Sequence, residues 1–81
     1  MTRPKTAAEA SVDGAQGLVA LGARIRHLRT ERHLSQEALA ASAGINRVTL
    51  SKIERGVEDV GVVRLHRLAT VLGVGIGDLF V

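Results

Sequence analysis

A short stretch of this chain carries side chains that could bind a polyanion and that fall on one face of a helix. Arg47, Val48, Ser51, Lys52 and Arg55 recur at intervals of one and three residues. At about 100° per residue, this spacing places them on one arc of an α-helix. A polar, basic helix face fits the major groove of B-DNA, where each base pair displays its own donors and acceptors. The alternative is a set of ordinary solvated side chains.

Each of these residues could make a different contact with DNA. Arg47 can bond guanine O6 and N7 bidentately and is the main candidate for reading a base, whereas Val48 could only contact a thymine methyl group. Ser51 and Lys52 lie one turn deeper and could reach bases or backbone. Arg55, near the end of the helix, is better placed to meet a phosphate.

The segment 35–56 predicts two short helices joined by a tight turn, the second being the recognition helix over 46–55. Ser35 and Asn46 can each cap a helix through a side-chain oxygen, and both are also candidates for contacts with DNA. Gly44 tolerates the positive φ at which the first helix can stop. Gln36 can bond a phosphate at the positive helix N-terminus and brace a residue of the second helix.

Apolar spacing predicts how the two helices pack. Their inward residues are expected to include a small one where the helices cross closely, and the set is Leu39, Ala40, Ala43, Ile45, Leu50 and Ile53. With the polar face turned outward, this is the geometry of a helix-turn-helix.

Further helices are predicted on both sides of the motif. Apolar residues recur at intervals of three and four residues from Leu18 to Arg32, which indicates an amphipathic helix. Most of its arginines are expected to form the solvated face. A helix over 62–72 is followed by a short helix or turn within 74–81. Residues 1–17 are expected to be a flexible or partly helical leader, with an arm to DNA or packing across a dimer as alternatives. The predicted fold is all-α, a compact bundle of four to five short helices over 18–81.

Composition excludes several classes of protein. The 81 residues contain no cysteine, one aromatic residue and a formal net charge of +3. No disulfide framework is possible, and base stacking on aromatic platforms is disfavoured. The three histidines lack ligand spacing, and no nucleophile stands beside a base, so we expect no metal, no cofactor and no enzyme. Without an apolar span or signal segment, a cytoplasmic protein with no membrane association is expected.

The motif resembles that of the Cro/CI-type (Xre) helix-turn-helix family. The resemblance is carried by Ser35-Gln36, Leu39-Ala40, Gly44-Ile45, Leu50-Ser51, Ile53 and Glu54-Arg55-Gly56, within a match from about Leu21 to Leu79. It implies a lambda-repressor-like fold and a transcriptional regulator, similar to small stand-alone regulators such as restriction-modification controller proteins. It also implies a structural ion pair between Arg29 and Glu54, and a positive φ at His33, where the family often has glycine.

The same resemblance implies a homodimer that binds double-stranded DNA at a palindromic operator. Ile76, Phe80 and Val81 are apolar residues at the end of the chain and are the expected dimer interface. The loop after the motif departs from the family because it carries Glu58 and Asp59, which phosphates would repel. An alternative function therefore stays open, namely an antitoxin or an Xre-like protein-interaction module with a toxin or another protein as its partner.

Overall fold

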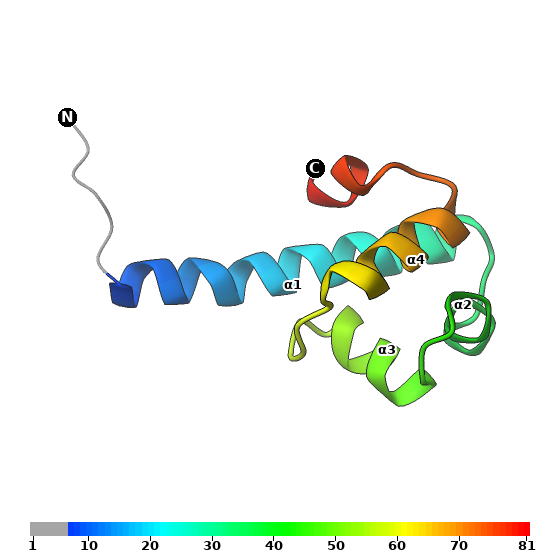
Figure 1. The fold of residues 1–81 in the computed structure, drawn as a ribbon, viewed down its shortest axis with the longest axis horizontal. Coiled ribbons are helices and arrows are strands. Elements are labelled where there is room, and N and C mark those ends of the chain that lie inside the picture. The colour runs from blue at the N-terminus through cyan, green and yellow to red at the C-terminus, as the bar shows by residue number, and fades with distance from the viewer. Residues whose placement is uncertain (1–6) are drawn as a thin grey trace.

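A long first helix lies beside a group of shorter helices, which pack against its C-terminal half and against one another. The computed structural model describes residues 7–81, with side chains from residue 14 onward. The elements are α1 (Ala7–Glu31), α2 (Gln36–Ala43), α3 (Arg47–Glu54), α4 (Val62–Leu72) and a 3-10 helix, η1 (Ile76–Phe80). Figure 1 shows α2, α3 and α4 gathered on one side of α1, with η1 returning to it. The predicted all-α bundle is confirmed.

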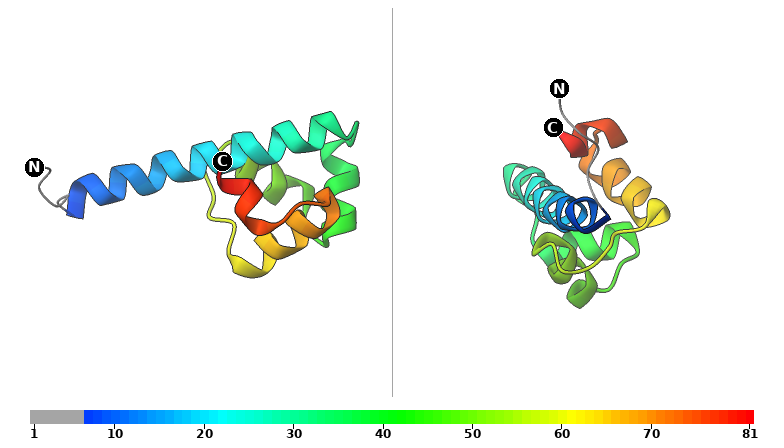
Figure 2. Two further views of the ribbon diagram at one scale, coloured as in Figure 1. Left: turned by 90° about the horizontal axis from the view of Figure 1, so that it is seen from above. Right: turned by 90° about the vertical axis from the view of Figure 1, so that its left-hand side faces the viewer.

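Helix α1 begins at Ala7 rather than at Leu18, where the apolar pattern starts. Its N-terminal half projects beyond the other helices (Figure 2), which gives the molecule extents of 45 × 22 × 20 Å. The apolar pattern therefore identifies only the half of α1 that packs against the other helices. The projecting half is rich in alanine, the residue of highest helix propensity, and contains no proline. Residues 1–6 of the expected leader lie outside the described residues.

The core is built from aliphatic side chains of every element. All the inward residues expected for the motif are buried, including Leu39 and Leu50, which are fully inaccessible. Ile25 of α1, Leu68 of α4 and Leu79 of η1 complete the same cluster. Because this burial removes apolar surface from water, it supplies the main stabilising free energy of the fold.

The ends of the motif helices have the predicted caps. Ser35 Oγ accepts from the Ala38 N–H at 3.0 Å, and Asn46 Oδ1 accepts from the Val48 N–H at 2.8 Å. Gly44 ends α2 at φ 67°. His33 has φ 55°, as expected for a position that favours glycine.

A close approach between α1 and α3 depends on a glycine that the sequence pattern did not single out. A Cβ on Gly22 would overlap the carbonyl oxygen of Ile53 and lie 2.7 Å from that of Glu54. One turn earlier in α1, Val19 lies against Gly56, which follows α3. A Cβ on Gly56 would lie 2.5 Å from Cα of Val19. The backbone of α1 thus lies directly against the C-terminal end of α3.

Arg24 of α1 and Arg32, which directly follows α1, bond to the C-terminal part of the chain; Arg24 is half-buried, whereas Arg32 stays exposed, as expected for a mostly solvated face. Arg32 Nε donates to the Leu72 carbonyl oxygen at 2.6 Å, at the end of α4. Arg24 Nε donates to the Asp78 carbonyl oxygen at 3.0 Å, within η1. Helix C-termini leave carbonyl groups without intrahelical partners, and a guanidinium group satisfies them well.

The glycine contact can be tested by stability. Gly22→Ala should lower the free energy of unfolding by about 1–3 kcal/mol, because the added methyl group overlaps backbone atoms that cannot move independently. Gly17→Ala is the matched control, since a Cβ there meets nothing within 4 Å. That change should raise stability by roughly 0.5–1 kcal/mol. Urea unfolding followed by circular dichroism measures both, and equal stabilities would contradict the close approach.

Candidate nucleic-acid interface

Helix α3 separates its side chains into a buried face and an outward face. Leu50 and Ile53 are buried at 0% and 1% exposure, which fixes the rotation of the helix about its axis. Arg47, Val48 and Lys52 are exposed on the other side, with Val48 at 57%. The structure therefore brings the candidate base-reading residues together on one surface.

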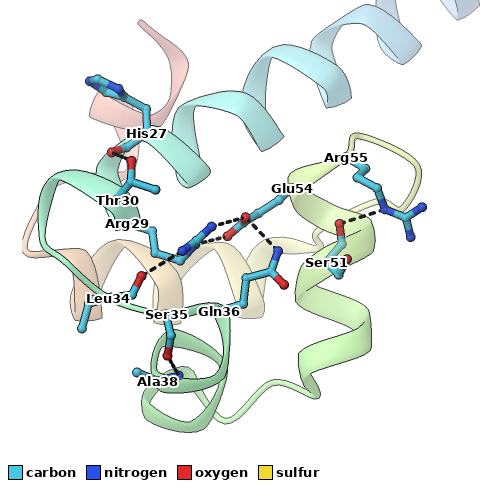
Figure 3. Close-up of polar contacts among 10 residues, drawn as sticks. All are labelled: His27, Arg29, Thr30, Leu34, Ser35, Gln36, Ala38, Ser51, Glu54 and Arg55. Carbon is cyan, nitrogen blue, oxygen red and sulfur yellow. Dashed lines mark hydrogen bonds and ion pairs between the residues drawn. The ribbon is translucent and has the colours of Figure 1, made fainter.

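Two candidates, Ser51 and Arg55, contact each other at the C-terminal end of α3. Ser51 is half-buried, and its carbonyl oxygen accepts from Nε of Arg55 at 3.4 Å. This contact holds the exposed Arg55 guanidinium along the last turn of the helix (Figure 3). Arg55 is thus an exposed residue at the C-cap of α3.

The two capping residues lie at the N-termini of the motif helices. The side-chain oxygens of Ser35 and Asn46 accept from backbone N–H groups of α2 and α3. Each side chain still has a donor group, the Ser35 hydroxyl and the Asn46 amide nitrogen. Both caps are thus compatible with a contact to DNA through the remaining donor.

Arg29 of α1 and Glu54 of α3 form a bidentate ion pair. Arg29 Nε lies 2.7 Å from Oε2 of Glu54, and Nη2 of Arg29 lies 3.0 Å from Oε1. The side chains are 12% and 2% exposed. Arg29 also donates from Nη1 to the Leu34 carbonyl oxygen at 2.8 Å, and Gln36 donates from Nε2 to Oε1 of Glu54 at 3.1 Å. Figure 3 shows this cluster joining α1, α2 and α3.

Both carboxylates of the loop between α3 and α4, those of Glu58 and Asp59, interact with other groups of the same chain. Glu58 Oε2 lies 3.4 Å from Nη1 of Arg64. Asp59 Oδ1 accepts from the Gly61 N–H at 3.2 Å and so closes a local turn. The negative charge of Glu58 is therefore partly balanced by Arg64 of α4.

The expected interface residues at the C-terminal end differ in burial. Ile76 is half-buried and packs against the core, whereas Phe80 and Val81 are 62% and 83% exposed. Phe80 borders an apolar groove of about 400 Å³. The residues that line the groove include Leu18 of α1 and Val62 of α4.

Within 7–81, no helix combines the length and apolar character needed to cross a membrane. The same part of the chain contains no group of three acidic or histidine side chains that could hold a metal ion.

Several known proteins are similar to this chain in sequence or in structure. The helix-turn-helix family model HTH_3 matches residues 25–79. Control protein C.MunI of Mycoplasma sp. is 35% identical over 63 residues, which cover 76% of this chain and 85% of the relative. Control protein C.BamHI of Bacillus amyloliquefaciens is 34% identical over 59 residues, or 72% and 73% of the two chains. The crystal structure of the restriction-modification controller protein C.AhdI from Aeromonas hydrophila matches with a TM-score of 0.76 at 43% identity, covering 78% and 96%. The predicted lambda-repressor-like fold is confirmed.

The ion pair can be distinguished from the exposed face by melting temperature. Glu54→Ala should lower the melting temperature more than Arg47→Ala does. The former leaves Arg29 without its partner inside the fold, a loss of about 3–5 kcal/mol, whereas the latter trims an exposed side chain. Thermal denaturation followed by circular dichroism compares the two variants. Equal melting temperatures would show that the buried pair contributes nothing to stability.

Proposed function

The chain belongs to the HTH_3 helix-turn-helix family of DNA-binding transcriptional regulators, the Cro/CI-type (Xre) group, and we propose that it binds a palindromic operator as a homodimer through α3. The observation that carries this proposal is the division of α3 into a fully buried face and an exposed basic face. A regulator of this kind acts by binding DNA and catalyses no reaction.

The contacts of α3 divide into reading and anchoring. Arg47 is the main base reader, with guanine as its preferred partner, and Val48 adds an apolar contact to a thymine methyl group. Lys52 and Ser51 contact bases or backbone one turn further along. Arg55 anchors a phosphate, which carries no sequence information directly.

A dimer is proposed because one motif contacts few base pairs, whereas a two-fold pair reads two half-sites about one helical turn apart. Phe80 and Val81 support the position of the interface, because they are highly exposed apolar side chains. The groove beside Phe80 extends this apolar surface to α1 and α4. Ile76 contributes from its half-buried position in η1.

The relatives favour one class of regulated process. Two of them are control proteins and one is a restriction-modification controller. We infer a similar role here, in preference to an antitoxin that neutralises a toxin. A nuclease or methyltransferase gene beside the gene for this chain would support that role, whereas a toxin gene there would favour the antitoxin.

Sequence-specific binding is tested by comparing two arginines. Arg47→Ala should reduce affinity for the operator by about 1–3 kcal/mol per half-site and relax the preference at one base pair. Arg55→Ala should weaken binding to all sequences alike, because a phosphate contact is the same at every step. Equilibrium binding to an operator selected from a random library, and to unrelated DNA, measures both. An equal loss on both DNAs for Arg47→Ala would make Arg47 a backbone anchor.

The interface is tested by charge. Phe80→Glu should give a folded monomer, because a carboxylate at the centre of an apolar interface loses its hydration on association. Phe80→Leu, which keeps the apolar character, should remain a dimer. Sedimentation should give about twice the 8.6 kDa chain mass for the dimer, while circular dichroism monitors the helices. Loss of helix signal in Phe80→Glu would show that this side chain supports the fold of one subunit and would count against an interface there.

A further inference from the structure

Arg24 makes the one side-chain hydrogen bond that joins η1 to another helix within residues 14–81. Its Nε donates to the Asp78 carbonyl oxygen at 3.0 Å, and Arg24 is half-buried. Apolar contacts also hold η1, chiefly those of Leu79, which is 1% exposed, and of the half-buried Ile76. Apolar burial is non-directional, whereas a hydrogen bond constrains both distance and angle. Arg24 therefore adds a directional constraint on how η1 is oriented against α1.

The same turn of α1 contacts α3 on its other side. A Cβ on Gly22 would lie 2.7 Å from the carbonyl oxygen of Glu54, so the backbone of α1 lies against the end of α3. Gly22 and Arg24 are two residues apart, which corresponds to about 200° around the helix. They therefore face nearly opposite sides of α1, and Figure 1 shows α3 below α1 and η1 above it. One turn of α1 thus connects α3 to η1.

η1 also carries the side chains expected to join two subunits. Phe80 is 62% exposed, and Val81, which directly follows η1, is 83% exposed. In the proposed dimer these side chains meet a second copy of the chain, so the orientation of η1 determines where that copy holds its own α3. Two recognition helices at a fixed separation fit two half-sites at a fixed spacing. One extra base pair turns a half-site by about 35° and moves it by about 3.4 Å.

We propose that Arg24 is a positioning residue that sets the spacing of the operator half-sites, because it fixes η1 and the dimer contacts relative to α3. This inference rests on the proposed function, since it requires a homodimer on paired half-sites. A dimer that adapts to a longer or shorter site must reorient η1 and break the Arg24 bond in each subunit. A protein without this bond lacks that penalty and should tolerate altered spacings better.

The test compares affinities for paired half-sites at different spacings. Wild type and Arg24→Met are each titrated with the operator that wild type selects, and with versions that have one base pair more or less between the half-sites. Wild type should bind the selected spacing more tightly than either altered spacing. Methionine is long but has no donor, so Arg24→Met should reduce this ratio of affinities by about 5-fold or more, since each dimer loses two hydrogen bonds.

Two further variants separate the hydrogen bond from charge. The ammonium group of lysine can still donate to the Asp78 carbonyl oxygen, so Arg24→Lys should keep most of the spacing preference. Arg26→Met removes the same charge from the same helix, but Arg26 is exposed and makes no side-chain hydrogen bond within residues 14–81. It should change the affinity for all spacings alike and keep the wild-type ratio. Circular dichroism checks that each variant is folded.

Several results would overturn the inference. An unchanged ratio in folded Arg24→Met would show that the bond does not set the spacing, and an equal fall in Arg26→Met would assign the effect to charge. If Arg24→Met does not fold, NMR of the free wild-type protein decides. The Nε hydrogen of Arg24 must then exchange with water more slowly than that of Arg26, and equal exchange would remove the bond. A wild-type protein that selects no paired half-sites would instead refute the proposed function.

Discussion

The ion pair between Arg29 and Glu54 is the interaction on which the arrangement of the motif depends. Removing two charges from water is costly, and the cost is offset only where the geometry is good and further hydrogen bonds satisfy the remaining groups. Both conditions hold here, because the pair is bidentate and the Leu34 carbonyl oxygen and the Gln36 amide complete it. These four bonds connect α1, α2 and α3. One cluster of side chains therefore fixes the positions of the three helices relative to one another.

The C-terminal end of α3 is also constrained by the backbone of α1. The backbone of α1 at Gly22 lies against the carbonyl oxygens of Ile53 and Glu54, where no side chain could be accommodated. The side chain of Glu54 and the backbone that carries it are therefore both held by α1. As a result, the exposed face of α3, with Arg47 at its first turn, has a defined direction relative to the rest of the molecule.

The sequence predicted the features that depend on local chemistry. The caps at Ser35 and Asn46 and the turn at Gly44 follow from residue type and spacing, and the apolar period identified the core of the motif. These signals are readable because each one arises from a few neighbouring residues. The resemblance to a known family added the pairing of Arg29 with Glu54.

Other features were missed because they depend on contacts between distant parts of the chain. Gly22 looks like an unfavourable residue inside a helix until α3 is placed against it. Arg24 and Arg32 look solvated, yet they reach carbonyl oxygens 54 and 40 residues away. The N-terminal half of α1 lacks an apolar period because it projects from the bundle, so periodicity alone could not predict its helix.

The exposed position of Phe80 has a spectroscopic consequence. The chain contains no tryptophan and no tyrosine, and Phe80 is its only phenylalanine. Apart from the three histidine rings, every aromatic resonance in a proton spectrum therefore comes from this single ring beside the apolar groove. The ring is a natural probe, present without any label, that reports on binding at this surface while leaving the proposed DNA-binding face on α3 unmodified.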